Sequence, residues 1–191
     1  MKTLAEIYLP VEELLTNQLF NIILDIIKQK KKIPYLDSDK NPKEEYLEYF
    51  IVTDALISFN RRGGNKKNNK VTGTQLKDAI KYAMRTDEEL TKQGFNKMYG
   101  TSVGTSLYSF ISLVKKEITK CRIVGHEISH QSFGNGLISK IEMQKEFVWF
   151  KYNDDLKMLS MDHFSLDKED EQKIKKILDS SGESKMEEIK L

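Results

Sequence analysis

Cysteine is scarce in this chain, and no long apolar run occurs. The 191 residues include one cysteine, Cys121, which excludes an internal disulfide framework and any zinc site built from several cysteines. A lone thiol suits a reducing compartment. The most apolar stretch, 19–27, contains Asn21 and Asp25, and no segment approaches the roughly eighteen apolar residues of a membrane-spanning helix. Since a signal-peptide pattern is missing as well, we expect a cytoplasmic protein without a membrane partner.

Proline and net charge are also low, which argues against a disordered chain. Three prolines, 39% hydrophobic residues and a formal net charge of +2 indicate a folded protein. The charge is unevenly distributed, because residues 61–120 hold thirteen Lys/Arg against five Asp/Glu and residues 153–191 hold seven against eleven. A basic middle region points to a polyanionic partner, although lysines that only solvate helix faces would give the same pattern.

The spacing of apolar residues predicts a mainly helical chain, with a change from helical to strand periodicity near residue 121. Residues at three- and four-residue spacing predict amphipathic helices at about 11–28, 42–58, 74–85, 86–99 and 102–119. Pro42, Thr74 and Thr86 suit the starts of three of them. From 121 to 161, alternating apolar residues with turn signals at 131–136 and 153–155 predict a small antiparallel sheet. A charged helix then begins at Ser165 or Asp167.

The segment 95–118, FNKMYGTSVGTSLYSFISLVKKEI, has the layout of a helix-turn-helix. A short helix would end at Tyr99, Gly100 would allow the sharp turn, and the second helix would enter a DNA groove. The candidates for contact with phosphates or base edges are Thr101, Ser102, Thr105, Ser106 and Ser109, and the candidates for backbone contact are Lys115, Lys116 and Lys120. A basic loop, NRRGGNKKNNK, adds Arg61, Arg62, Lys66, Lys67 and Lys70.

A helix-turn-helix followed by strand-like runs is the order of a winged helix. Residues 90–160, including GLISKIEMQKEFVWFKYNDDLKML, resemble the winged-helix replication initiators of bacterial plasmids in their pattern of residue types. That resemblance implies binding to repeated DNA sites and a homodimer. The family usually carries a second winged-helix domain, for which this chain is too short.

Two short motifs suggest catalysis, but their local sequence does not fit. HEISH (126–130) matches H-E-x-x-H, in which His126, Glu127 and His130 would serve a zinc hydrolase if they lay on one helical turn. The flanking composition favours a strand instead, which would separate Glu127 from the histidines. GTSVG (100–104) matches the G-x-S-x-G nucleophile elbow, yet the buried strand that must precede Ser102 is missing.

These observations predict an α+β protein, a mainly helical domain with a helix-turn-helix followed by a small antiparallel sheet. The expected division is an N-terminal helical segment (1–60), a basic loop (61–73), a winged-helix-like domain (74–179) and a disordered tail (180–191). The predicted function is non-enzymatic DNA binding, without a cofactor, by a replication initiator or regulator of a plasmid, phage or other mobile element. One alternative is a small inhibitor that binds a host protein through its basic face, and the other is the zinc hydrolase.

Overall fold

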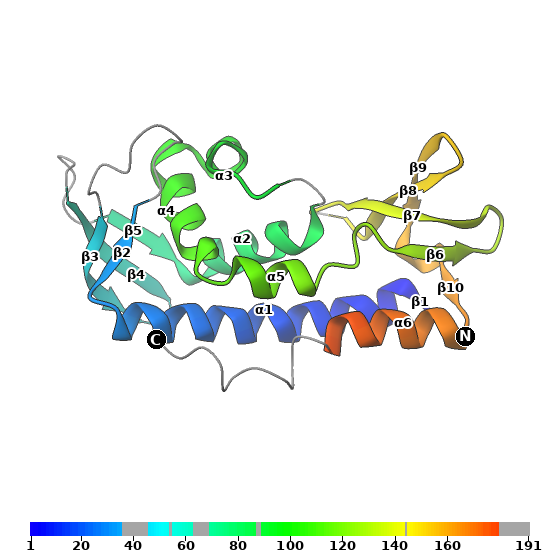
Figure 1. Cartoon of the computed structure of the whole chain (residues 1–191), viewed down its shortest axis with the longest axis horizontal. Helices are drawn as coiled ribbons and strands as arrows, with labels where there is room; N and C mark the ends of the chain where they lie inside the picture. Colours follow the sequence, from blue (N-terminus) through cyan, green and yellow to red (C-terminus); the bar gives the residue numbers. More distant parts are fainter. Residues whose placement is uncertain (36–45, 54, 63–68, 87–88, 144, 180–191) are drawn as a thin grey trace. The chain divides into compact units, whose positions relative to one another are not determined.

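The computed structural model describes residues 1–35, 46–53, 55–62, 69–86, 89–143 and 145–179 (Figure 1). These residues form helices and antiparallel sheets, so the predicted α+β class is confirmed. The centre of the predicted basic loop and the predicted tail lie outside the described residues.

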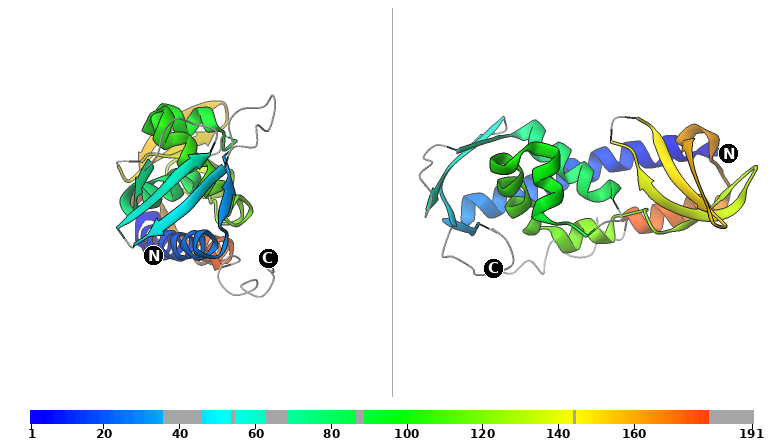
Figure 2. Two further views of the ribbon diagram at one scale, coloured as in Figure 1. Left: turned by 90° about the vertical axis from the view of Figure 1, so that its left-hand side faces the viewer. Right: turned by 90° about the horizontal axis from the view of Figure 1, so that it is seen from above.

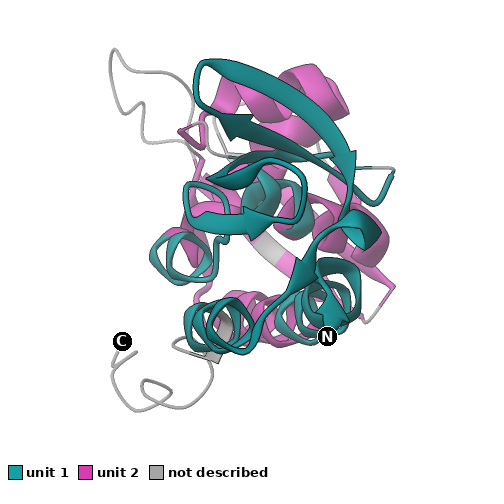
Figure 3. Cartoon of the chain, turned by 90° about the vertical axis from the view of Figure 1, so that its right-hand side faces the viewer, with its two compact units in different colours: residues 1–16, 81–88, 116–191 teal, residues 17–80, 89–115 magenta. Residues whose placement is uncertain are grey.

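The chain divides into two compact units (Figure 3). Unit 1 comprises residues 1–16, 81–88 and 116–191, and unit 2 comprises residues 17–80 and 89–115. Three helices, α1 (Leu4–Gln29), α2 (Gly73–Arg85) and α5 (Lys115–Lys120), contribute residues to both units. Each unit therefore draws on both the 1–60 and the 74–179 portions of the sequence.

Helix α1 starts at Leu4, earlier than the predicted start near residue 11. Thr3 and Glu6 form a reciprocal capping box in which the Glu6 amide donates to Thr3 Oγ1 at 3.2 Å and the Thr3 amide donates to Glu6 Oε2 at 2.8 Å. The helix continues through Pro10, which removes one backbone donor from its interior. The capping box marks the start of α1, and the buried side chains of Leu4, Ile7 and Tyr8 continue the apolar spacing back to it.

The segment predicted as a second helix (42–58) contains two strands, so that prediction is wrong. β3 (Tyr46–Val52) pairs antiparallel with β4 (Leu56–Arg62). A bulge between Glu48 and Ile51 adds one residue to β3. As a result, Leu47, which is fully buried, and Phe50, which contacts buried aromatic rings, lie three residues apart. That spacing imitates the period of a helix in a segment whose aromatic and β-branched residues favour a strand.

Unit 2 contains a four-stranded antiparallel sheet that the sequence did not predict. β2 (Lys32–Pro34) and β5 (Asn69–Thr72) flank the β3–β4 pair, giving the order β2-β3-β4-β5, and the left view of Figure 2 looks onto this sheet. Ile33 lies opposite Leu47 and Ile57 opposite Val71, and all four side chains are buried on one face.

Thr72 and Thr91, and not the predicted Thr74 and Thr86, cap the next two helices. Thr72 forms a capping box with Gln75 at the start of α2, with hydrogen bonds of 2.9 and 3.1 Å. Thr91 precedes α3 (Lys92–Tyr99), and its hydroxyl accepts a hydrogen bond of 3.2 Å from an amide of the first turn. The helix predicted from residue 86 therefore begins six residues later.

The predicted helical hairpin is present in unit 2. α3 ends at Gly100, whose φ of 79° suits glycine, and α4 (Thr101–Ser112) follows directly. A β-carbon on Gly104 would lie 2.5 Å from the carbonyl oxygen of Phe95, so glycine there lets α4 approach the backbone of α3 closely. Both glycines of GTSVG thus have structural roles. After a short interruption at 113–114, α5 (Lys115–Lys120) completes the predicted 102–119 helix.

Unit 1 contains the predicted C-terminal sheet. β6 (Glu127–His130), β7 (Gly134–Ile141), β8 (Phe147–Tyr152) and β9 (Asp155–Ser160) form an antiparallel meander, with turns at the predicted positions. A short 3-10 helix (Met161–His163) follows, and β10 (Ser165–Leu166) pairs with β1 (Lys2–Thr3). The last helix, α6 (Lys168–Asp179), starts after Asp167, whose carboxylate accepts two amide hydrogen bonds of 2.9 and 2.8 Å. The predicted final helix is confirmed.

A buried ion pair connects three segments of unit 1. Arg85 of α2 donates to both carboxylate oxygens of Glu12 in α1, at 2.6 and 2.5 Å, and to the carbonyl of Glu142 at 2.6 Å. The Tyr8 hydroxyl donates to the same carboxylate at 2.9 Å. Burial opposes the charge of Arg85, but the hydrogen bonds and charge of Glu12 outweigh it and raise the pKa of Arg85. Arg85 therefore stays charged in a buried position, with Glu12 as its hydrogen-bonded partner.

Candidate functional site

The polar side of the predicted recognition helix is buried, which overturns its predicted role. Thr105, Ser106 and Ser109 are 2%, 4% and 1% exposed. Their hydroxyl groups donate to backbone carbonyls one turn earlier in α4, at 2.8, 3.1 and 3.0 Å. This local hydrogen bonding satisfies each hydroxyl and allows small polar side chains to pack inside the protein. These three residues are not available to a DNA groove.

The remaining candidates on this segment lie at the start of α4 and on α5. Thr101 and Ser102 are exposed at the start of α4, in unit 2. Lys115 lies 3.7 Å from Glu89, and both belong to unit 2. Lys116 and Lys120 are exposed on α5 and belong to unit 1. The three lysines that were predicted to act together thus lie on one short helix, α5, although the boundary between the units falls after Lys115.

The candidate residues of the predicted basic loop do not all lie in a loop. Arg61 stacks on Tyr35, with its guanidinium carbon 3.9 Å from the ring centroid, and donates to the Tyr35 hydroxyl at 3.2 Å. Arg62 is the last residue of β4, and Lys70 is exposed on β5. Lys66 and Lys67 lie outside the described residues. Because Arg61, Arg62 and Lys70 are strand residues, the loop is shorter than the predicted 61–73.

HEISH does not form the helix that a zinc hydrolase requires, because residues 127–130 are strand β6. Glu127 is exposed, whereas His130 is 6% exposed and its ring stacks on Phe133 at 4.8 Å between centroids. His130 Nδ1 accepts the amide hydrogen of Ser132 at 3.1 Å. Within the described ranges, no group of three or more His, Cys, Asp or Glu side chains is arranged to hold a metal ion.

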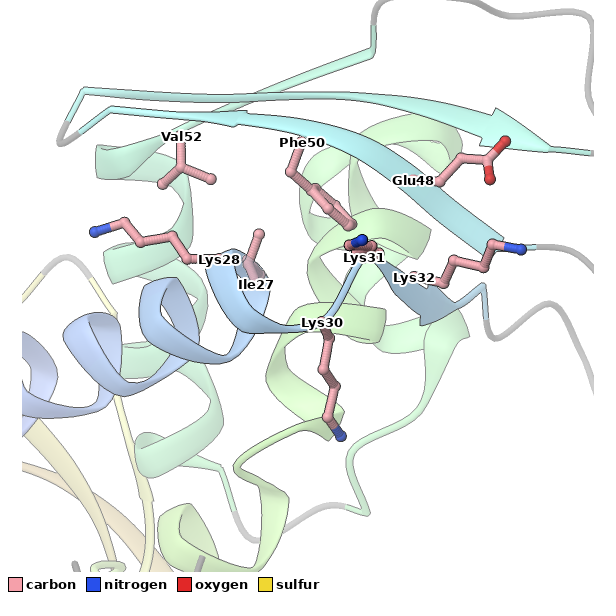
Figure 4. A pocket seen from close by; sticks show the side chains of 8 residues that line it. All are labelled: Ile27, Lys28, Lys30, Lys31, Lys32, Glu48, Phe50 and Val52. Atoms are coloured by element: carbon pink, nitrogen blue, oxygen red, sulfur yellow. The ribbon is translucent and has the colours of Figure 1, made fainter. Parts of the chain in front are cut away.

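A groove of about 530 Å³ in unit 2 is the candidate functional site. It lies where α1 ends, between that helix, β2 and β3 (Figure 4). Its basic lining residues are Lys28, Lys30, Lys31 and Lys32, and its acidic lining residue is Glu48. The groove therefore carries an excess of three positive charges, which favours an anionic ligand.

The chain places these lysines together because α1 ends within the run KQKKK (28–32). Lysines in the last turn complement the partial negative charge at a helix C-terminus, which is equivalent to only about half an elementary charge. The four lysines carry more positive charge than the helix dipole requires, and all four are exposed. None of Lys28, Lys30 and Lys31 forms an ion pair with another side chain in the described part of the chain. Lys32 lies 4.9 Å from the Tyr46 ring centroid, across the β2–β3 pair.

The inner part of the groove is apolar. Phe50 and Val52 project from β3 toward Ile27 of α1, whereas Lys30 extends away from β3 (Figure 4). The Phe50 ring is held by Phe59 at 6.1 Å and by Phe110 of α4 at 6.4 Å between centroids, so its position is supported from the core. The lining thus offers positive charge at the rim and an aromatic surface inside.

Sequence reasoning missed this site, although one signal for it was present. The run KQKKK lies at the end of the predicted 11–28 helix, and the strands that bring Phe50 and Val52 beside it were predicted as a helix. Four lysines in five residues at a helix end could have identified the basic rim.

Comparison of the chain with models of known protein families, with curated proteins and with solved structures finds no match. In the part of the chain that the structure describes, no helix combines the length and apolar character needed to cross a bilayer. The groove is therefore the feature from which a function is inferred.

Proposed function

We propose that this chain is a non-enzymatic DNA-binding protein that holds phosphates in the groove between α1, β2 and β3. The observation that supports the proposal is the group of four exposed lysines around one concave site. Lysine is a point charge suited to phosphate, and backbone contacts of this kind require no particular base sequence. The groove lining contains lysine, apolar side chains and one glutamate, a composition suited to binding.

This proposal replaces the predicted mode of recognition. A winged helix would read base edges with α4, but α4 buries three of the five small polar side chains that would do so. Contact through phosphates at the groove needs no recognition helix. The resemblance of residues 90–160 to plasmid replication initiators extends the proposal to replication or regulation on a mobile element.

The salt dependence of binding tests this proposal. Each phosphate neutralised on a duplex contributes about −0.9 to the slope of log Kobs against log salt, so three or four lysine contacts predict a slope of about −3. We expect the double variant Lys28→Ala/Lys31→Ala to bind more weakly, with the slope reduced in magnitude by about 2. Fluorescence anisotropy with labelled duplex DNA at several salt concentrations measures both quantities.

A matched control separates the groove from net charge. Lys168→Ala/Lys176→Ala removes the same two charges, but both lysines are exposed on α6 in unit 1, away from the groove lining. The slope of log Kobs against log salt should remain steeper for the control variant than for the groove variant. Equal slopes for the two variants, or no salt-dependent binding by the wild type, would refute binding at the groove.

Protein binding is a second candidate function, and the exposed face of the unit 1 sheet favours it. Leu137 and Leu156 lie opposite Lys151 in one cross-strand row, and Met158 lies opposite Trp149. The two leucines and Met158 are 42%, 52% and 49% exposed, an unusual grouping for a soluble sheet face. If a protein partner binds there, Leu156→Lys/Met158→Lys should abolish its binding and leave DNA affinity unchanged. Retained partner binding by that variant would exclude this face.

A further inference from the structure

We propose that the groove selects single-stranded DNA over duplex DNA by accepting an unpaired base against Phe50. This inference rests on the proposed function, because it assumes that DNA occupies the groove. It adds to that function that the bound DNA is single-stranded and that Phe50 selects it.

The arrangement of charge and aromatic surface carries the inference. Lys28 and Lys31 lie beside the apolar residues that line the same groove, Ile27, Phe50 and Val52. Nucleotides present an anionic backbone and an apolar base face within one short repeat. Sites for single strands characteristically combine a positive groove with an aromatic ring on which a base stacks.

Duplex DNA cannot use the apolar part of this groove. In a duplex, each base face is covered by its stacked neighbours, so a side chain reaches it only after the base is unstacked. A duplex would therefore contact the lysine rim alone. A single strand would contact the rim with its phosphates and Phe50 with a base.

The aromatic contacts of Phe50 with the core favour its role as a surface on which a base stacks. Phe59 and Phe110 hold the ring from the core side, and Phe110 is fully buried in α4. A ring held in place loses little conformational freedom when a base stacks on it, which increases the net gain from the contact. Phe50 is half-buried, so part of the ring remains accessible at the groove.

The test compares wild type with three variants on matched DNA ligands. Phe50→Leu keeps an apolar side chain and removes the aromatic face, Phe50→Tyr keeps the face, and Ile51→Ala removes apolar surface from a neighbouring side chain that is 69% exposed. The ligands are a short thymidine oligonucleotide, an abasic oligonucleotide with the same number of phosphates, a duplex of equal length, and thymidine monophosphate. Anisotropy competition at one salt concentration gives the affinities, and circular dichroism verifies folding.

We expect wild type to prefer the thymidine strand to the abasic strand by about 5- to 150-fold, the range for one stacked base. Phe50→Leu should lose most of that preference, whereas Phe50→Tyr and Ile51→Ala should retain it. The monophosphate should compete weakly, since it offers one phosphate to several lysines; competition equal to that of the strand would overturn the assignment to DNA.

Three other outcomes are distinguishable. DNA binding with equal affinity for thymidine, abasic and duplex ligands would overturn the single-strand inference and leave phosphate binding intact. If a folded Phe50→Leu variant prefers the thymidine strand to the abasic strand as strongly as wild type does, Phe50 is not the residue on which the base stacks. Absence of binding to every ligand would refute the proposed function itself. If Phe50→Leu fails to fold, the thymidine-to-abasic ratio of wild type still decides the inference.

Discussion

Replacing Arg85 with leucine should destabilise unit 1 strongly, because it leaves the Glu12 carboxylate buried without its cation. Glu12 is 2% exposed and Arg85 is 8% exposed. Breaking a buried ion pair from one side costs about 3–5 kcal/mol, since the remaining charge loses its compensation. The carbonyl oxygens of Glu142 and Met143 also lose their donor. For a chain of this size, the loss corresponds to a decrease in Tm of about 6–20 °C.

Two comparisons isolate the cause of that loss. In Glu12→Leu/Arg85→Leu no charge remains buried, so the double variant should recover a large part of the stability that Arg85→Leu loses. Lys81→Ala removes a neighbouring pair between the same two helices, Lys81 and Glu13 at 2.6 Å, whose side chains are 29% and 55% exposed, and should cost at most about 1 kcal/mol. Urea unfolding measured by circular dichroism gives all three values. A loss below about 1 kcal/mol for Arg85→Leu, or a double variant less stable than the single one, would refute this reasoning.

The other predictions concern buried positions in both units. Burial, and then the nearby His163, lower the pKa of His130 from 6.5, so stability due to its neutral ring is complete above about pH 6.5 and declines as the pH falls, by at most about 1.4 kcal/mol per pH unit. Urea titrations from pH 7.5 to 5 should show a smaller decline for His130→Phe; an unchanged decline would contradict the assignment. Gly104→Ala should cost about 1–3 kcal/mol in urea unfolding because its β-carbon meets the α3 backbone, and wild-type stability would refute that close approach. Ser106→Glu should lose about 3 kcal/mol or more by burying an unpaired charge, as thermal unfolding can measure; a stable Ser106→Glu protein would restore the predicted surface role of this residue.

The sequence predicted those elements whose local pattern agrees with their tertiary surroundings. The alternation in 127–160 and the turn at Asn153, with its φ of 52°, follow from local chemistry, and the sheet is present as predicted. The strands β3 and β4 could not be predicted in this way. The bulge places Leu47 and Phe50 three residues apart, and only pairing with β4 distinguishes that spacing from a helix.

The DNA-binding residues were misassigned for a related reason. Serine and threonine in α4 looked like a solvent-exposed side, but their hydroxyl groups bond to their own helix, and Gly104 draws α4 against α3. The groove depends on contacts between β3 and the end of α1, which are separated in sequence by residues 30–45. Composition indicated a basic protein surface, but only the folded arrangement relates Lys31 to Phe50.

Mapping lysine protection in the DNA complex tests the central claim most directly. The free and DNA-bound protein would be treated with an amine-reactive reagent, and the modified lysines would be quantified by mass spectrometry. If the groove holds the phosphates, Lys28 and Lys31 should be protected by DNA, whereas Lys176, exposed on α6, should react equally in both states. Unchanged reactivity of Lys28 and Lys31 in a saturated complex would contradict the assignment of DNA binding to this groove.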